Sequence, residues 1–289
     1  MRTERQWVIQ EHSNGMAVRE FLKQEARFSR QFFKKVKESG AVYLDGKQVR
    51  LHKSLETGGK LKVIFPEERR SARILPEDLP LSIIYEDEDF IVVNKQAGIA
   101  VSPSVQHPSG TIANGLAYYY DQHNISSAVH IVTRLDRDTS GLMVVSKHQY
   151  GHALLSEHTD LKRQYVALAE GMFSEESGRI SAPIGRKRGS IIEREVQPEG
   201  RPAETDYRII QTGKDRTLVE LSLLTGRTHQ IRVHMSHIGH PLFGDTLYGG
   251  KPSPWLTGQA LHCCRVDFKH PFTSEFLTFS LPIPDNWQY

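Results

Sequence analysis

The sequence contains little cysteine and no long apolar run. Cys263 and Cys264 are the only cysteines among 289 residues, and neighbours in sequence are badly placed to bridge each other, which excludes a disulfide framework. No stretch reaches the roughly 20 apolar residues that span a bilayer, and the charged segment 1–7 lacks the apolar core of a signal peptide. These absences predict a cytoplasmic protein without a membrane segment.

Several nucleotide-binding and metal-binding patterns are also missing. The sequence has no phosphate-loop, dinucleotide-binding or cysteine-zinc motif, and no internal repeat or low-complexity segment. His229, His234, His237 and His240 invite a metal interpretation, but they come without a cysteine or acidic ligand at a recognised zinc spacing. We therefore expect neither a metal nor a cofactor.

Positive charge is concentrated at the front of the chain. The formal net charge is +3, yet residues 1–70 hold 16 Lys and Arg against 9 Asp and Glu, so this segment carries +7 and the remaining residues carry −4. Such an excess in a small module indicates a polyanionic partner, RNA or DNA; the alternative is a solvated charged face. A chain of this length can bury one sizeable core and one small companion domain.

The front segment has the pattern of two helices followed by short strands. Ser29 is a candidate N-cap, Phe32 and Val36 belong to an apolar stripe at helical spacing, and Gly40 ends the helix. Strands are predicted over 41–44 and 60–65, and an Asp-Gly turn follows the first of them.

Beyond residue 80 the pattern indicates a mixed α+β domain. The proline-containing segment 66–80 breaks both periodicities and is typical of a linker. Strands joined by short turns, with a few helices inserted, favour a largely antiparallel sheet. The predicted strands cover residues 83–85, 90–94, 142–146, 165–169, 206–211 and 218–224, and the predicted helices cover 111–121, 150–158 and 229–238.

The most informative stretch is the segment 130–142, which contains Arg-Leu-Asp-Arg-Asp-Thr-Ser-Gly-Leu. It places the carboxylate of Asp136 between Arg134 and Arg137, ahead of a tight Thr-Ser-Gly turn. Two guanidinium groups would favour the charged carboxylate, so the pattern predicts an ionised aspartate held in a fixed direction. A surface salt-bridge cluster in a loop is the alternative for so short a motif.

Residues 134–142 resemble the motif of the RluA-type RNA pseudouridine synthases, and further segments fit the same family in the same order. These are residues 94–101, 162–171, 223–234 and 239–249, and the resemblance covers most of residues 80–285. The front segment resembles the small RNA-binding domain first known from ribosomal protein S-four. Three positions depart from the usual patterns: Gln96 replaces a proline, Thr133 replaces a histidine, and Gly59 replaces an acidic residue.

The resemblance implies an isomerase that converts uridine to pseudouridine in structured RNA by means of an essential aspartate, without a cofactor. It identifies Asp136 as the catalytic aspartate, Arg232 as its basic partner and Tyr165 as the aromatic residue against the target base. Ile231 would lie beneath the base, and Arg134 would occupy the space left by the everted nucleotide. Without the resemblance, Tyr165 and Ile231 would be interpreted as packed core residues, and Arg232 as a solvated helix residue.

Residues further along the chain complete the expectation. Arg227 and His229 would support the turn or touch RNA, and Asp245 and Tyr248 would brace the site. Arg30 and Lys34 of the front helix, and the basic turn that contains Arg186, would contact RNA phosphates.

The predicted organisation is an RNA-binding domain over 1–70, a linker over 71–80 and a catalytic domain over 81–289. The catalytic domain would have the α+β pseudouridine synthase fold, with a mixed, largely antiparallel sheet. A monomer is expected, and ribosomal RNA is favoured over transfer RNA. Two rival functions stay open: a catalytically inactive RNA-binding or ribosome-assembly factor, and a retaining glycosidase. The glycosidase would need a second carboxylate about 5 Å from Asp136, and Asp138 is the nearest in sequence.

Overall fold

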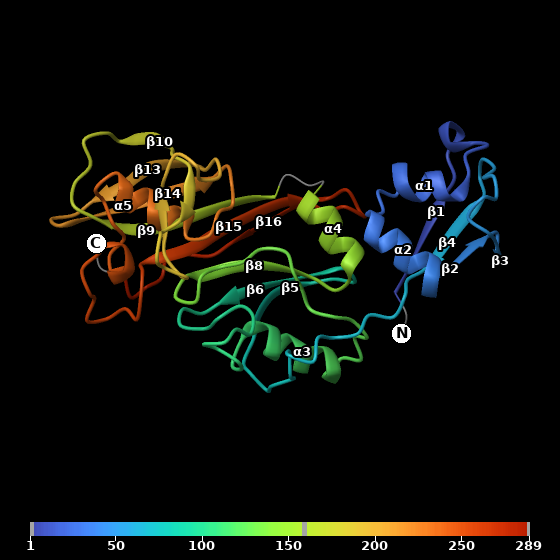
Figure 1. The fold of residues 1–289 in the computed structure, drawn as a ribbon, viewed down its shortest axis with the longest axis horizontal. Coiled ribbons are helices and arrows are strands. Elements are labelled where there is room, and N and C mark those ends of the chain that lie inside the picture. Colours follow the sequence, from blue (N-terminus) through green and yellow to red (C-terminus); the bar gives the residue numbers. More distant parts are fainter. Residues whose placement is uncertain (1–2, 158–160, 288–289) are drawn as a thin grey trace.

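The computed structural model describes residues 3–157 and 161–287, which form a small N-terminal unit and a larger unit built on one long sheet (Figure 1). The small unit lies at one end of an elongated molecule, next to helix α4 of the larger unit. No helix within these ranges is long and apolar enough to cross a membrane.

The small unit contains a four-stranded antiparallel sheet in the order β1-β4-β2-β3, together with two α-helices. The strands are β1 (Glu4–Val8), β2 (Ala41–Leu44), β3 (Lys47–Gln48) and β4 (Lys60–Ile64); the helices are α1 (Val18–Gln24) and α2 (Arg30–Ser39), with the 3-10 turn η1 (Glu11–Ser13) between β1 and α1. The order of two helices and then short strands is confirmed, while β1 precedes them and was not predicted.

Helix α2 begins and ends where its sequence predicts. The Ser29 side chain accepts a hydrogen bond from the Phe32 backbone N–H at 3.2 Å, and this satisfies one of the free donors of the first turn. At the other end, a Cβ atom on Gly40 would lie 2.8 Å from the carbonyl oxygens of Val36 and Ile64. Only glycine therefore lets the chain turn directly from α2 into β2.

A ten-stranded mixed sheet forms the larger unit. Its main path runs β10-β13-β14-β9-β15-β8-β6-β5, with β16 paired to β15 and β7 paired to β8. The pairings are antiparallel except for β15 with β8, so the predicted largely antiparallel α+β fold is confirmed. The strands are β5 (Ser82–Glu86), β6 (Phe90–Lys95), β7 (His130–Ile131), β8 (Ser140–Ser146), β9 (Lys162–Glu170), β10 (Ser177–Ser181), β13 (Glu204–Thr212), β14 (Arg216–Leu223), β15 (Leu261–Lys269) and β16 (Phe276–Ser280).

Three α-helices, a separate hairpin and a 3-10 turn accompany this sheet. They are α3 (Ile112–Gln122), α4 (Gln149–Glu157), α5 (Gln230–His237), β11 (Ile184–Arg186) with β12 (Arg194–Val196), and η2 (Thr246–Tyr248). All three helices were predicted to within one or two residues; position 158, the predicted end of the second, lies outside the described residues. Six strands of the larger unit were not predicted: β7, β10, β11, β12, β15 and β16.

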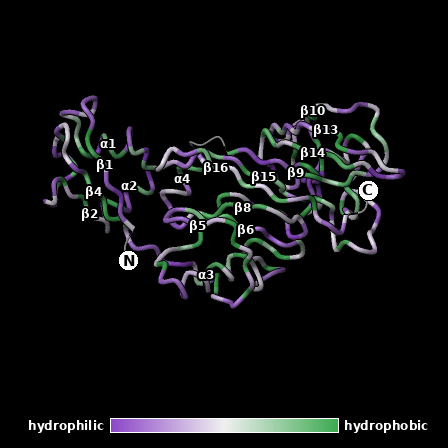
Figure 2. Tube along the Cα trace, turned by 180° about the vertical axis from the view of Figure 1, so that it is seen from behind, coloured by the Kyte–Doolittle hydropathy of each residue, from purple (hydrophilic) through white to green (hydrophobic). Residues whose placement is uncertain are grey.

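The centre of the sheet is apolar, as the hydropathy colouring shows along β6 and β8 (Figure 2). Phe90, Ile91, Val92 and Val93 of β6 are all at most 1% exposed. Strands covered on both faces contain continuous apolar runs rather than alternation, and this is why β6 and β8 were visible in the sequence.

The two units share an apolar cluster. Tyr150 and Leu154 of α4 pack among the core residues of the small unit, and the Tyr150 ring lies 4.7 Å from that of Phe28 and stacks at 5.4 Å on that of Phe32. The Tyr150 hydroxyl also donates a hydrogen bond to the Ala26 carbonyl at 2.5 Å. We call Phe28, Phe32, Tyr150 and Leu154 the junction cluster.

Residues 66–81, which include the predicted linker, contain no helix or strand, and they are tied to the larger unit. Arg70 donates hydrogen bonds to the carbonyls of Ala117 and Ser127, and the Glu77 carboxylate accepts one from Gly110 N–H. The connection therefore follows helix α3 as a fixed segment.

Candidate active site

A cavity of about 580 Å³ opens where the loop between β7 and β8 meets the start of β9 and the N-terminal end of α5. This volume is within the range of small-ligand sites. Five of the residues predicted for the site line this one cavity: Arg134, Asp136, Tyr165, Ile231 and Arg232.

The loop that carries Asp136 is fixed from below. Its turn is closed by a hydrogen bond from Thr139 N–H to the Asp136 carbonyl, and the side chain of Thr139 accepts another from Gln259. Lys95, which is 1% exposed, donates from Nζ to three carbonyls, those of Gln96, Ile99 and Arg137. Burial lowers the pKa of Lys95 to about 8, although the carboxylates of Asp138 and Asp136 act in the opposite direction. Sequence reasoning missed this role of Lys95.

Gly141 allows the loop to enter β8. Its φ of +110° is unfavourable for other residues, and a Cβ atom there would lie 2.3 Å from the Cys263 carbonyl oxygen. The parallel pairing of β8 with β15 passes through this contact. The glycine after Thr139 and Ser140 is thus required by close packing between two strands, as well as by the turn.

Asp136 faces a guanidinium group held by a second carboxylate. Arg232 Nη1 lies 3.2 Å from Asp136 Oδ2, while Nε and Nη2 of the same group bind both oxygens of Asp245 at 2.7 and 2.8 Å. Asp245 is 1% exposed, whereas Asp136 is 27% exposed towards the cavity. Burial acts to lower the pKa of Arg232, but the two carboxylates outweigh it and raise that pKa. The result is a permanently charged arginine beside a partly open carboxylate.

The expected role of Arg137 in this pairing is wrong. Arg137 binds the neighbouring Asp138 with two hydrogen bonds of 2.9 Å, and the cation beside Asp136 comes from α5. Arg134 is exposed at the cavity wall. Adjacent residues in a tight loop diverge, so sequence proximity indicated the wrong arginine.

His229 lies on the other side of Asp136 in a left-handed backbone conformation, with φ of +57°. Its Nε2 is 3.9 Å from Asp136 Oδ1, and its Nδ1 is 2.7 Å from the Tyr248 hydroxyl, which accepts a hydrogen bond from Arg194 N–H. Burial lowers the pKa of His229 against the opposing effect of Asp136. We infer a neutral imidazole whose Nε2–H faces the carboxylate. The expected bracing residues are in place, since the Arg232 guanidinium also lies 4.9 Å from the centre of the Tyr248 ring.

Tyr165 and Ile231 form apolar walls of the cavity, and each is 4% exposed. Burial, helped by the neighbouring Cys263, raises the pKa of Tyr165. A neutral phenol ring and an aliphatic side chain provide a surface on which a flat base can lie.

Gln230 fixes the loop before α5, and sequence reasoning missed it. Its side-chain oxygen accepts hydrogen bonds from Thr225 Oγ1 and Arg227 N–H, while its nitrogen donates to the Glu204 carbonyl and to Thr205 Oγ1. His234, one turn further along the helix, bonds to Thr205 and to the Ala182 carbonyl. These contacts tie α5 to β13.

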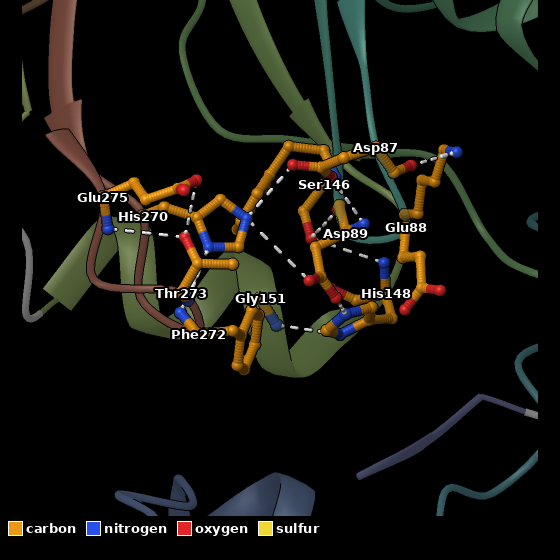
Figure 3. Close-up of polar contacts among 12 residues, drawn as sticks. Asp87, Glu88, Asp89, Ser146, His148, Gly151, His270, Phe272, Thr273 and Glu275 are labelled. Atoms are coloured by element: carbon orange, nitrogen blue, oxygen red, sulfur yellow. Dashed lines mark hydrogen bonds and ion pairs between the residues drawn. The ribbon is translucent and has the colours of Figure 1, made fainter. Parts of the chain in front are cut away.

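A second polar cluster lies beyond the cavity, around the hairpin between β5 and β6 (Figure 3). We call it the hairpin cluster: Asp87, Asp89, His148 and His270. The ligand atoms of Asp87, Asp89 and His270 lie within 4.8 Å of one another, a spacing that could hold a metal ion. These groups are however engaged inside the protein, and Arg5 of the small unit forms an ion pair with Asp89.

Backbone hydrogen bonds identify the accepting ring nitrogen of each histidine in the hairpin cluster. His148 Nδ1 accepts from Gly151 N–H, so Nε2 carries the proton that points at Asp89 Oδ1, 2.8 Å away. Burial and the Arg5 charge lower the pKa of His148 to about 3. His270 Nδ1 likewise accepts from backbone N–H groups, and its Nε2 lies 3.1 Å from Asp87 Oδ2.

The other predicted RNA-contact residues lie away from the cavity. Arg30 and Lys34 are on the exposed face of α2, where Lys34 Nζ lies 3.8 Å from Glu38. Arg186 is exposed at the end of β11. The structure does not bring these three side chains to the site.

Comparisons with known proteins agree with one another. The model of the RNA pseudouridylate synthase family matches residues 89–237. The chain is 44% identical over 275 residues to the uncharacterized RNA pseudouridine synthase YjbO of Bacillus subtilis, covering 94% of this chain and 96% of that protein. It is 39% identical over 261 residues to ribosomal large subunit pseudouridine synthase D of Yersinia pestis, covering 85% and 80%.

A solved structure supports the same assignment. Human RNA pseudouridylate synthase domain containing 1 superposes with a TM-score of 0.56 at 26% identity, covering 75% of this chain and 86% of that one. Sequence, fold and site geometry thus agree: the chain belongs to the RNA pseudouridylate synthase family, and it is an isomerase that acts on RNA.

Proposed function

We propose that this RNA pseudouridine synthase modifies uridines of ribosomal RNA, and that Asp136 carries the reaction. The observation behind the second part is the 3.2 Å contact between Asp136 and Arg232 in an open cavity. For the RNA, the support is similarity to a ribosomal large subunit enzyme at 39% identity, together with the basic front segment. Transfer RNA is the alternative substrate.

The reaction requires no electron carrier. The bond between the sugar and nitrogen 1 of uracil breaks, the base turns within the site, and the same sugar carbon bonds to carbon 5, whose proton is lost while nitrogen 1 gains one. The Asp136 carboxylate would either attack the anomeric carbon or remove a proton from the sugar, and either step needs the charged form. Arg232 lies beside the carboxylate, where it would balance its charge, and cavity walls would keep water from the intermediate.

The remaining cavity residues receive roles in binding. The base would lie between Tyr165 and Ile231, and stacking on an aromatic face is worth about 1 to 3 kcal/mol. Arg134, exposed at the cavity wall, would occupy the space left in the RNA. His229 would hold the carboxylate in place.

The small unit is proposed as an RNA-binding domain like that of ribosomal protein S-four. Residues 1–70 would bind RNA through Arg30 and Lys34, residues 71–80 would connect, and residues 81–289 would form the catalytic domain, with Arg186 as a further phosphate contact. Helix α2 supports this proposal because it presents these side chains to solvent. A monomeric state and a cytoplasmic location stay predictions.

Both rival functions have less support. An inactive RNA-binding factor would not need the closed contacts among Asp136, Arg232 and Asp245. A glycosidase would need a second, protonated carboxyl group, whereas Asp138 is bound to Arg137 and Asp245 to Arg232.

The test is Asp136→Asn, with Asp138→Asn as the control on the same loop. We expect the first change to lower the rate of pseudouridine formation in ribosomal RNA by about 1,000-fold or more, because the amide keeps the shape but loses the charge. Binding of the RNA should persist, and Asp138→Asn should keep most of the activity. Substantial product from Asp136→Asn would remove the proposed role, and absence of product from the wild-type enzyme on ribosomal RNA would remove the proposed substrate.

A further inference from the structure

Arg163 is a cavity residue to which neither the sequence nor the proposed mechanism gives a role. It lies on β9 two positions before Tyr165, and the alternate residues Tyr165 and Ala167 belong to one buried cluster whereas Val166 and Leu168 belong to another. Residues at i and i+2 of a strand share a face. Arg163 therefore faces the same cavity as Tyr165, and it lines that cavity.

The guanidinium group of Arg163 is held against the loop before α5. A Cβ atom on Gly226 would lie 3.1 Å from Arg163 Nη2 and 3.8 Å from Nη1, so the glycine leaves room for this group. The charge of Arg163 also acts to lower the pKa values of Tyr165 and Cys263, against the larger effect of burial. Both observations place the positive charge at the inner wall of the cavity.

The charge of Arg163 lacks a counterion in the part of the chain that the structure describes. Its Nε is buried and makes no hydrogen bond there. The other arginines of the inner wall are engaged, since Arg232 binds two carboxylates and Arg227 Nε donates to the Pro202 carbonyl. Arg163 is partly buried, and a bound anion would stabilise a partly buried guanidinium group that has no counterion.

We propose that Arg163 binds an RNA phosphate group adjacent to the everted uridine, which makes it a substrate-binding residue of the proposed reaction. Positions 163 and 165 are separated by roughly 7 Å along the strand, so a base on Tyr165 would leave the guanidinium beyond its edge, within reach of a phosphate of the same nucleotide. The planar fork of arginine fits two phosphate oxygens at once. This inference rests on the proposed function because it requires the target base to occupy the cavity.

The experiment combines a protein change with an RNA change. The uridine modified by the wild-type enzyme is mapped, and an RNA fragment around it is synthesised with a neutral methylphosphonate at the phosphate on its 5′ side or on its 3′ side. On RNA that carries no methylphosphonate, Arg163→Gln should lower kcat/KM by about 10- to 100-fold. This is the range for the loss of one charge-assisted hydrogen bond. A methylphosphonate at one of the two positions should lower kcat/KM of the wild-type enzyme by a similar factor. The same substitution should not lower kcat/KM of Arg163→Gln any further.

Matched variants separate charge from fold. Arg163→Lys should restore part of the activity, and Gly226→Ala, which crowds the guanidinium group, should reproduce part of the loss. Arg265→Gln is the control, because Arg265 lies on the neighbouring strand and pairs with Asp267 outside the cavity lining. It should leave kcat/KM and the methylphosphonate effect unchanged.

The outcomes are distinct. Equal methylphosphonate losses with wild-type enzyme and Arg163→Gln at both positions would overturn the proposal, and would point to the base as the partner instead. If Arg163→Gln does not fold, the same comparison with Gly226→Ala decides. Binding of the RNA fragments to Asp136→Asn, with and without Arg163→Gln, repeats the cycle without catalysis, so it tests the phosphate contact even if the proposed role of Asp136 fails.

Discussion

The active-site cluster of Asp136, His229, Arg232 and Asp245 and the hairpin cluster are built from the same residue types. Each combines two aspartates with histidine and recruits an arginine from elsewhere in the chain. They differ in closure. The side chains of Asp89, His148 and His270 are at most 7% exposed, and the more open Asp87, at 24%, accepts hydrogen bonds at both carboxylate oxygens. Asp136, at 27%, lines a cavity. Composition alone therefore does not identify an active site. An active site is identified by a charged group that is fixed on one side and open to a cavity on the other.

The arginines show the same contrast. Arg5 crosses from the small unit to reach Asp89 and lies 4.4 Å from the centre of the Phe272 ring, so it joins the two units. Arg232 is fixed by Asp245 and presents its remaining nitrogen to Asp136. One cluster completes the packing between units, and the other leaves a carboxylate available for chemistry.

Removing the arginine of the active-site cluster should have the largest effect. Arg232→Gln should lower pseudouridine formation by about 1,000-fold or more, since Asp136 loses its cation. It should also destabilise the protein by about 3 kcal/mol in urea unfolding, because Asp245 is left buried and unpaired. The double variant with Asp245→Asn should regain stability without regaining activity. Recovery of both together would mean that Arg232 acts only through the fold.

The hairpin cluster should instead respond to acid through stability. The folded-state pKa of His148 is lowered to about 3, against 6.5 for the ordinary side chain. Below pH 6.5 the unfolded chain binds a proton that the folded chain refuses, so this contribution to stability is lost as pH falls from 6.5 towards 3. Unfolding free energies measured between pH 7 and 4 should fall less steeply for His148→Gln. An unchanged slope would show that His148 does not titrate in this way.

The smallest effect is expected at the junction cluster. Tyr150→Phe removes the hydrogen bond to the Ala26 carbonyl while the ring stays in place, and should cost about 1 kcal/mol of unfolding free energy. The rate of pseudouridine formation on saturating RNA should not change, since Tyr150 does not line the cavity. A fall in that rate without a fall in stability would connect the junction directly to the chemistry.

Local features of the fold were predictable because they depend on neighbouring residues. The Ser29 cap, the glycine after α2 and the apolar runs of β6 and β8 can be read within a few positions. Strand β15 was missed because it begins Leu-His-Cys-Cys-Arg and has neither a continuous apolar run nor regular alternation. Its burial follows from its position between β9 and β8.

The site was predictable only where a motif identified it. The approach of Asp136 to Arg232 joins residues 96 positions apart, and it was expected from the family resemblance alone. The partner of Arg137, the three carbonyls bound by Lys95 and the Arg163 Nε, which makes no hydrogen bond among the described residues, depend on how strands meet in space. No pattern within the sequence encodes those contacts.

The junction cluster fixes the distance between the small unit and the active site. Because the rings of Phe28 and Phe32 pack on Tyr150, the small unit cannot turn about residues 66–81 without pulling an aromatic core apart. If α2 binds RNA as proposed, an RNA helix bound there would reach Asp136 over a constant distance. The protein would then determine the number of nucleotides between the RNA helix bound at α2 and the uridine that is modified.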